Sequence, residues 1–526
     1  MVSYKKPVLL SSEGINTGLR HLPEGEERTK AAVCEGDIAF FQSGHELKEL
    51  LIQRDADVSL KSRVHMLTQP PLSNVPNLLF PAFPDPQATQ QMALQFQLGE
   101  SQWWPQELLE NHQFRQLGQV LAHARQTVPF YRDLFAAKDI NLPATIDHAF
   151  LVTLPVVRRS DLQSFPEQFL STAPPKEHGP VAFAMTSGST GRPIRFGRSV
   201  ATQTLWGALA LRDLLWHPRD WSGKLCSIRW ASCGVAEAPD GVSFPGWGGI
   251  SDRLFKSGRS AGLNISATLG DQLAWLQREK PDYLISYASN LQELSAYAAR
   301  HGISLPRLRE LRTVGETVTP ETRRQLSEAW KVGIIDCYSC EESGYIALQC
   351  PDHDHYHVQG ESVIVEILDE NDRPCPVGTV GRIVLTNLNN FVTPLIRYEI
   401  GDYGELAEAC PCGRGLPVLK RVHGRIRNRL MLPNGENVFP NFGSKVEIAT
   451  MTGVALYQFQ FLQHSLQRIE VKLVMARPLD SGEQAKVAEF LLRNVGHPLE
   501  FAFSFPAEIP RGPNGKFEEF KCLIGS

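Results

Sequence analysis

Apolar residues recur at steps of three and four along one stretch of the chain, residues 105–135. The recurring positions are Leu109, Phe114, Leu117, Leu121, Ala124 and Val128. Residues spaced in this way lie on one face of an α-helix, so the pattern predicts an amphipathic helix that buries this face. Pro129 closes the helix, because proline lacks the backbone N–H that a helix interior requires. We expect this helix to open the main domain.

Between about residues 180 and 420, short β-rich runs alternate with helical stretches. Residues 283–286 and 363–367 are strand-like, and residues 290–301 have helical spacing. Turn-forming residues at 369–374 precede a second β-rich run at 381–386, which predicts a hairpin. The alternation of strands and helices is typical of an α/β architecture.

After Gly424 the chain contains two strand-like runs, residues 459–462 and 469–474, and one helical stretch, residues 483–494. This pattern predicts a smaller α+β domain over residues 424–526, next to a large domain over residues 101–423. Residues 1–100 are rich in Glu, Gln and Pro, and prolines are frequent in residues 69–86. We expect them to form an N-terminal extension of unknown role, joined by a semi-rigid linker.

Composition narrows the class of protein. The 526 residues are 42% apolar, enough to bury a large core in several domains. The 53 basic and 57 acidic residues nearly balance, so nucleic acid is not an expected partner. No apolar run approaches the roughly 18 residues that a membrane span requires, and we expect a cytoplasmic protein. The 10 cysteines are too sparse for a disulfide scaffold and fit reduced thiols or a metal site better.

The strongest local motif is a loop of hydroxyl and glycine residues, Met185-Thr-Ser-Gly-Ser-Thr-Gly-Arg-Pro193. Backbone N–H and side-chain O–H groups in such a loop can converge on phosphate oxygens. The loop lacks the Gly-Lys-Ser/Thr ending of a P-loop, which argues against a kinase or a P-loop NTPase. Taken alone, the same residues could form an ordinary surface turn.

This loop resembles the phosphate loop of the adenylate-forming acyl-CoA synthetase superfamily, and further blocks follow in the order of that family. Gly315-Glu-Thr317 is similar to the adenine-side loop, and Tyr338-Ser-Cys-Glu-Glu342 is similar to the Tyr-Gly-x-Thr-Glu block. Pro394-Leu-Ile-Arg-Tyr-Glu-Ile-Gly-Asp402 is similar to the ribose-binding block. Gly424-Arg425 is similar to the interdomain hinge, and Pro510-Arg-Gly-Pro-Asn-Gly-Lys516 is similar to the C-terminal lysine loop. Val128-Pro-Phe-Tyr-Arg132, Cys410-Pro-Cys-Gly-Arg414 and Asn437-Val-Phe-Pro440 are similar to the phenylacetate-coenzyme A ligase branch. The resemblance covers about residues 100–526.

The resemblance implies an α/β fold with a large multi-layer adenylate-forming domain and a smaller, mobile C-terminal lid. It implies that ATP joins a carboxylic acid to AMP with release of pyrophosphate, and that the acyl group then passes to coenzyme A. Catalysis would depend on cations and hydrogen-bond donors, because negative charge builds up around the α-phosphorus.

The same resemblance implies roles for individual residues. Lys516 would neutralise the developing charge, Glu342 would bind Mg²⁺, and Asp402 would accept the ribose hydroxyls. Further contacts to ATP or AMP would come from Thr186, Ser187, Gly188, Ser189, Thr190, Gly191, Gly315, Glu316, Thr317, Tyr338, Ser339 and Arg425. By family position, the acid would lie near Tyr287, Cys340 and Glu341, which do not name a substrate. The aromatic residues there could equally belong to the core.

Two departures from the family pattern keep alternatives open. Arg427 replaces the acidic residue usual at the hinge, and Ser339 and Glu341 replace the Gly and Thr of the Tyr-Gly-x-Thr-Glu block. The acceptor could therefore be an amine or a carrier-protein thiol instead of coenzyme A. The alternative from another functional class is a homologue that binds the nucleotide but does not catalyse a reaction. A homodimer is also possible.

Three cysteines and one histidine form a candidate metal site. Cys350, His357, Cys410 and Cys412 offer three thiolates and one imidazole, a set that Zn²⁺ accepts in closed structural sites. Their places are similar to those of cysteines and histidines in phenylacetate-ligase relatives. The alternative is a buried thiol at Cys350 beside a polar loop that contains His353, His355 and His357. If zinc is present, it would connect the loop that contains Glu342 to the strand that contains Asp402.

Overall fold

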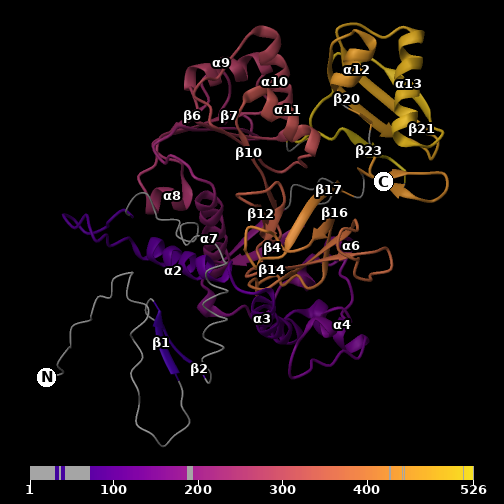
Figure 1. Cartoon of the computed structure of the whole chain (residues 1–526). Helices are drawn as coiled ribbons and strands as arrows, with labels where there is room; N and C mark the ends of the chain where they lie inside the picture. Colours follow the sequence, from indigo (N-terminus) through magenta and orange to yellow (C-terminus); the bar gives the residue numbers. More distant parts are fainter. Residues whose placement is uncertain are drawn as a thin grey trace, which may run out of the picture. The chain divides into compact units, whose positions relative to one another are not determined.

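The computed structural model describes residues 30–34, 37–41, 71–185, 194–425, 428–440, 442–443, 445–512 and 515–524. The chain divides into two compact units, Met1–Thr68 and Gln69–Ser526. In the first unit, strands β1 (Lys30–Cys34) and β2 (Asp37–Phe41) form an antiparallel pair (Figure 1). The second unit contains all the other elements described below.

Helices α3 (Gln106–Thr127) and α4 (Pro129–Ala137) account for the predicted amphipathic stretch. Leu109, Leu117 and Leu121 are buried, as their spacing predicted. Pro129 closes α3 as expected and also starts α4, because a proline fits the first turn of a helix, where its missing N–H is not needed. The periodic stretch is therefore two helices.

Helix α2 (Pro86–Ser101) lies inside the stretch that we expected to be an extension, yet it belongs to the second compact unit. Asp85 caps its N-terminus by accepting hydrogen bonds from Gln87 N and Ala88 N. Ala88 and Leu98 are buried against helix α7 (Val200–Trp216). The packed unit therefore starts before residue 100.

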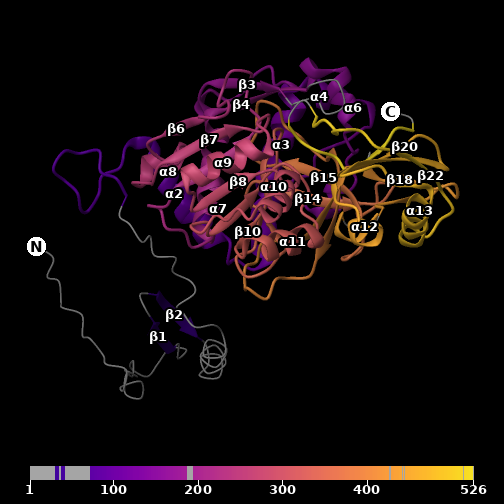
Figure 2. The ribbon, with the colours of Figure 1, turned by 90° about the horizontal axis from the view of Figure 1, so that it is seen from above.

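A six-stranded sheet follows the order β10-β9-β8-β5-β7-β6, and all its neighbours are parallel except β6 and β7. In Figures 1 and 2 its strands lie among α9, α10 and α11. The strands are β5 (Leu225–Arg229), β6 (Val242–Phe244), β7 (Ser260–Asn264), β8 (Tyr283–Ser286), β9 (Glu310–Thr313) and β10 (Gly333–Ile335), and the helices are α9 (Leu269–Glu279), α10 (Ala288–His301) and α11 (Pro320–Trp330). The predicted strand at 283–286 and helix at 290–301 are confirmed.

A seven-stranded antiparallel sheet occupies the next part of the chain, so the predicted strand–helix alternation stops near residue 335. The predicted hairpin is confirmed, because β14 pairs with β15 from Val363↔Asn387 to Leu368↔Arg382. In sheet order the strands are β11 (Cys337–Cys340), β12 (Gly344–Gln349), β13 (Tyr356–Val358), β17 (Val418–Arg425), β16 (Tyr398–Ala407), β15 (Gly381–Asn387) and β14 (Val363–Leu368).

Shorter elements connect these parts. They are α5 (His148–Leu151), α6 (Arg159–Ser164), α8 (Gly249–Leu254), the 3-10 turns η2 (Pro166–Phe169) and η3 (Lys176–His178), and the strand pairs β3 (Val181–Met185) with β4 (Arg195–Ser199) and β18 (Leu430–Met431) with β19 (Asn437–Val438). Strands β3 and β4 flank the glycine-rich loop.

The C-terminal part has a core of its own, in which Phe461, Val471 and Leu491 are buried. A four-stranded sheet, β22 (Glu500–Ser504)-β21 (Arg468–Met475)-β20 (Leu456–Gln463)-β23 (Phe520–Cys522), lies beside α12 (Lys445–Thr452) and α13 (Ser481–Val495) (Figure 1). Asp480 and Glu483 form a capping box at the start of α13. The predicted strands and helix of this part are confirmed, and so is the overall α/β fold class.

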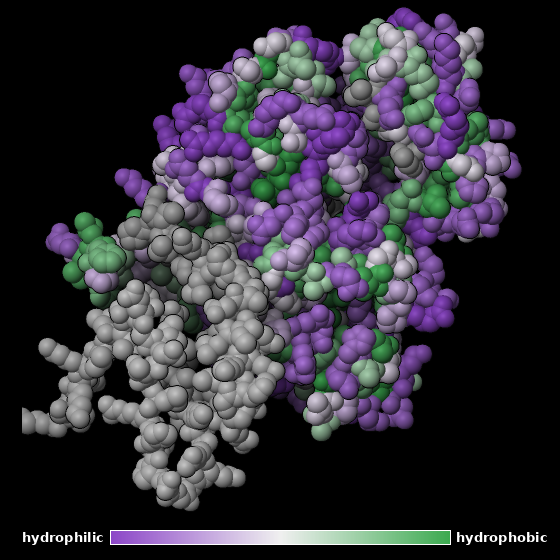
Figure 3. Space-filling model, in the orientation of Figure 1, coloured by the Kyte–Doolittle hydropathy of each residue, from purple (hydrophilic) through white to green (hydrophobic). Residues whose placement is uncertain are grey.

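Among the residues coloured by hydropathy, polar ones cover most of the face drawn in Figure 3. Within the described residues, every helix is too short or too polar to cross a bilayer.

Candidate functional site

Asp402 on β16 is the centre of a group of side chains that the sequence separates widely. Strand pairing sets Asp402 opposite Arg425 on β17, and Arg425 Nε lies 3.4 Å from Asp402 Oδ1. The Tyr338 hydroxyl donates a hydrogen bond to Asp402 Oδ2 at 2.8 Å. Burial raises the pKa of Asp402, while Arg425 and the Tyr338 hydrogen bond oppose that rise. Three of the predicted blocks therefore converge on one carboxylate.

Lys516 extends into the same region from the C-terminal part. A β-carbon on Gly315 would lie 3.0 Å from Lys516 Cε and 3.1 Å from its Nζ. Two backbone hydrogen bonds link the described residues of the lysine loop: Gly512 N donates to Lys516 O at 2.9 Å, and Gly515 N donates to Gly512 O at 2.8 Å. Burial, and then Arg425, lower the pKa of Lys516, whereas nearby carboxylates, Asp402 among them, raise it. The lysine ammonium therefore lies beside the Gly315 loop.

Glu316 joins the Gly315 loop to the lysine loop. Its Oε1 accepts from Phe517 N at 2.7 Å and from Ser289 Oγ at 3.1 Å, and its Oε2 accepts from Ser289 N at 2.9 Å. Burial raises the pKa of Glu316, and these hydrogen bonds oppose the rise. Both carboxylate oxygens therefore bind protein donors. Gly315 and Thr317, on either side, are exposed.

Glu342 is buried after the end of β11, where Arg159 Nη1 donates to its Oε1 at 2.9 Å. Arg159 Nη1 also lies 3.4 Å from the Tyr398 hydroxyl. The neighbouring Glu341 is exposed and pairs with Arg198 Nη2 at 3.0 Å. The guanidinium of Arg198 stacks over the Trp206 ring at 4.1 Å. No sequence motif marks either arginine, so only these contacts reveal them.

The predicted acid-pocket residues come from different elements, since Tyr287 directly precedes α10 and Cys340 is the last residue of β11. The Tyr287 ring is buried and lies 3.8 Å from the place of a β-carbon on Gly315 and 3.4 Å from that of one on Gly515. Cys340 Sγ accepts from Ser343 N at 3.2 Å, and burial raises the pKa of this thiol well above its usual value. Ser339 is exposed. A cavity of about 480 Å³ adjoins Gly515; its lining includes Trp230, Cys233, Asn264 and Arg511.

Two predicted features lie outside the described residues. The phosphate-loop residues Thr186, Ser187, Gly188, Ser189, Thr190 and Gly191 fall in the stretch 186–193, and Arg427 falls in 426–427. Their roles stay predictions.

The predicted metal ligands come together. One donor atom from each of Cys350, His357, Cys410 and Cys412 lies within 4.8 Å of all the others. Cys350 follows β12, His357 is in β13, and the other two are in the turn between β16 and β17. The three cysteines are free thiols. Three sulfur donors and one imidazole fit the tetrahedral coordination that Zn²⁺ adopts.

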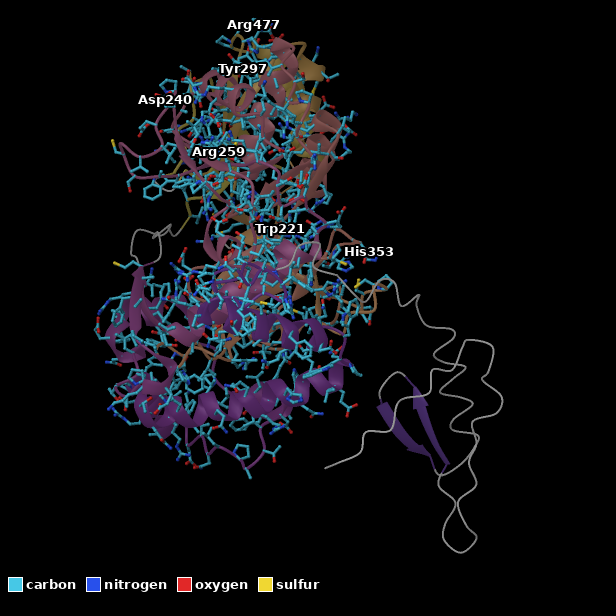
Figure 4. The ribbon with its side chains drawn as sticks, turned by 90° about the vertical axis from the view of Figure 1, so that its left-hand side faces the viewer. Trp221, Asp240, Arg259, Tyr297, His353 and Arg477 are labelled. Atoms are coloured by element: carbon cyan, nitrogen blue, oxygen red, sulfur yellow. The ribbon has the colours of Figure 1, made fainter. Side chains whose placement is uncertain are left out.

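Neighbouring groups orient these donors. His357 Nδ1 lies 3.4 Å from Leu416 O, which directs Nε2 toward Cys412 Sγ, also 3.4 Å away. His355 Nε2 lies 3.0 Å from Cys410 Sγ. His353, stacked on His355, is at the edge of the molecule near this cluster (Figure 4).

Known proteins resemble most of this chain. A phenylacetate-coenzyme A ligase of Thermus thermophilus is 25% identical over 448 residues, which are 78% of this chain and 96% of the relative. A phenylacetate-coenzyme A ligase of Pseudomonas putida is 24% identical over 411 residues, or 74% and 87% of the two chains. The family model described as the CapK C-terminal domain matches residues 436–521.

Solved structures of 2-hydroxyisobutyryl-CoA ligase have the same fold. In the postadenylation state with 2-HIB-AMP, that enzyme superposes with a TM-score of 0.63 at 18% identity, covering 80% of this chain and 90% of the other. In the thioesterification state the TM-score is 0.52 at 19% identity, covering 80% and 91%. Over most of its length the chain is therefore similar to phenylacetate-coenzyme A ligases, and its fold is that of 2-hydroxyisobutyryl-CoA ligase.

Proposed function

We propose that this protein is an AMP-forming acid–thiol ligase, which activates a carboxylic acid with ATP and transfers the acyl group to coenzyme A. The observation that carries the proposal is that Asp402, Tyr338 and Arg425 converge from three of the blocks, while Lys516 of the C-terminal part lies against the Gly315 loop. Homology with phenylacetate-coenzyme A ligases over most of both chains supports the same reaction.

In the first step, a carboxylate oxygen of the acid attacks the α-phosphorus of ATP. A bond forms between these two atoms, and the bond from the α-phosphorus to the oxygen that bridges to the β-phosphate breaks. Pyrophosphate leaves with that electron pair. Lys516 would stabilise the negative charge around phosphorus, and Asp402 would hold the ribose hydroxyls. The glycine-rich loop would bind the departing phosphates.

Glu342 is our candidate ligand for Mg²⁺. Arg159 binds one oxygen of its carboxylate, and the other oxygen, Oε2, is the atom that we propose for the metal. Mg²⁺ would supply positive charge to the phosphates of ATP.

In the second step, the thiol of coenzyme A loses its proton to water and its sulfur attacks the acyl carbonyl carbon. A C–S bond forms, the bond from the acyl carbon to the phosphate oxygen of AMP breaks, and AMP leaves with that electron pair. An amine or a carrier-protein thiol could react with the same adenylate, so the acceptor is the less constrained part of the proposal. Cytoplasmic location and a homodimer stay predictions.

Exchange of labelled pyrophosphate into ATP, measured with a panel of aryl and alkyl acids, tests the first step. We expect exchange that depends on one class of acid and on Mg²⁺. Mass analysis of products with coenzyme A, an amine or a carrier protein then identifies the acceptor. If no acid supports exchange above a Lys516→Ala control, the protein is a non-catalytic homologue and the proposal fails.

Asp402→Asn is expected to raise the KM for ATP by about 10- to 100-fold, because a charged acceptor contributes more to a hydrogen bond than an amide oxygen does. The variant should also discriminate less between ATP and 2′-deoxy-ATP. Pyrophosphate exchange at varied nucleotide concentration measures both quantities. An unchanged KM with unchanged discrimination would remove Asp402 from the ribose site.

Gly315→Ala is expected to lower the rate of adenylate formation by about tenfold, since a methyl group there would lie 3.0 Å from Lys516 Cε and displace this side chain. Gly302→Ala is the matched control. Gly302 also has a positive φ, of 63° against 72° for Gly315, but no atom lies within 4 Å of its added β-carbon. Equal losses of activity in the two variants would attribute the effect to backbone strain instead.

A further inference from the structure

A set of polar contacts fastens the lysine loop to the start of helix α10 and to Glu316. We propose that Arg511, Ser289, Glu293 and Glu316 form a latch that positions Lys516 for adenylate formation and is released for acyl transfer. This inference rests on the proposed function. It assigns Arg511 as a positioning residue, which acts through Lys516 and not on the substrate.

The first half of the latch is the side chain of Arg511, which precedes Lys516 in the loop. Arg511 Nη2 donates to Glu293 Oε2 at 2.8 Å, and Arg511 Nη1 donates to Ser289 Oγ at 2.8 Å. The side chain of Glu293 is 5% exposed and that of Arg511 is 16% exposed. A charge pair shielded from water to this extent interacts more strongly than one on an open surface.

The second half holds the residue directly after Lys516. Phe517 N donates to Glu316 Oε1, and the Phe517 side chain is buried. Glu316 also accepts from the backbone N–H of Ser289, in the first turn of α10. A carboxylate is favourable there, because the first N–H groups of a helix lack partners within it. Lys516 is therefore held on its N-terminal side through Arg511 and on its C-terminal side through Phe517.

Helix α10 provides the docking face. Ser289 and Glu293 are four residues apart, so they lie one above the other on the same side of the helix. The same side receives strand β20, because Gln458 Nε2 donates to Glu293 Oε1 at 3.3 Å. Gln458 Oε1 in turn accepts from Ile509 N at 2.9 Å. Further along α10, the guanidinium of Arg300 stacks over the Tyr457 ring at 4.4 Å.

These contacts suit an interface that opens. They consist largely of ion pairs and hydrogen bonds whose partners can bind water after separation, so their loss costs less than exposure of an apolar interface would.

Separate half-reactions test the latch. Arg511→Met is expected to slow pyrophosphate exchange by about tenfold or more, because Lys516 is less often in position. The rate of thioester formation from a supplied acyl-adenylate should be unchanged or faster. Glu293→Gln should likewise slow pyrophosphate exchange and leave the rate of thioester formation unchanged or faster. Equal slowing of both half-reactions, or no effect on either, would overturn the proposal.

Arg477→Met is the matched control. Arg477 is an arginine of the same C-terminal part, half-exposed and paired with Glu483 at 2.7 Å, and it lies at the outer edge of the molecule in Figure 4. Its loss should leave both half-reactions unchanged. If Arg477→Met slows pyrophosphate exchange as much as Arg511→Met does, the assignment of Arg511 is overturned. The slowing would then follow from the loss of any arginine in the C-terminal part.

Hydrogen–deuterium exchange provides a readout that needs no activity. In Arg511→Met, amides of residues 509–519, including Phe517 N, should exchange faster. The core of the C-terminal part and the cores of the rest of the second unit should stay protected. Arg477→Met should leave this peptide unchanged. If the peptide is protected equally in all variants, the latch is wrong. If it loosens but no acid supports pyrophosphate exchange, the proposed function fails and the latch stands.

Discussion

Lys516→Ala is expected to lower the rate of acyl-adenylate formation by about 100-fold or more, with little loss of fold stability. The lysine ammonium is held in a partly buried space beside Gly315, and burial lowers its pKa. Such a charge contributes mainly when negative charge develops in the transition state, and its removal does not weaken the core. Pyrophosphate exchange measures the rate, and thermal unfolding measures the stability.

Two controls identify the role of Lys516. Thioester formation from a supplied acyl-adenylate should keep nearly its full rate, because that step does not involve the α-phosphate of ATP. The lowered pKa also has a signature: the ammonium is lost at a lower pH than in an ordinary lysine with a pKa of 10.5, so adenylation should decline on the alkaline side below that value. An unchanged rate in Lys516→Ala would contradict the assigned role.

Cys350→Ser is expected to reduce bound zinc from one ion per chain to nearly none, and to lower the free energy of unfolding by more than about 2 kcal/mol. The four donors connect β12, β13 and the turn between β16 and β17. A metal bound there stabilises the folded chain, because the donors are far apart in the unfolded chain. Elemental analysis and thermal unfolding measure the two effects.

Cys233→Ser is the control for this site, since Cys233 is an exposed free thiol outside the cluster. It should keep both the zinc and the unfolding temperature. We also expect Cys350→Ser to reduce adenylation, because Asp402 is on β16, the strand that leads to Cys410 and Cys412. Purified protein without zinc, or a Cys350→Ser variant that is fully loaded, would refute the metal site.

Much of the fold could be predicted from local patterns. The helix that starts near residue 105, the hairpin between β14 and β15, and the strands and helix after Gly424 all follow from apolar periodicity and turn residues. The prediction ended the helix at Pro129, where α3 does end, but it did not foresee that the apolar spacing beyond the proline belongs to a second helix, α4. It also missed that the region after residue 335 is an antiparallel sheet, since short strands do not reveal their partners.

In the candidate site, too, some residues could be predicted from the sequence and others could not. Motifs marked Asp402, Lys516 and the four metal ligands in advance, because these residues stand in short runs of characteristic sequence. Arg159 and Arg198 carry no such mark, and they were found through their contacts with Glu342 and Glu341. The nucleotide role of Glu316 stays a prediction, and no motif indicated that its carboxylate hydrogen-bonds to Ser289 and to Phe517 N.

The sequence by itself therefore determined which segments form helices and strands, and which chemical groups are available for a reaction with ATP. Only the tertiary structure decided which of those groups meet. Arg511 and Glu293 are separated by 218 residues, and Arg159 and Glu342 by 183. Local propensity depends on neighbours within a few turns of chain, whereas a buried ion pair forms where packing removes water from two distant charges at once.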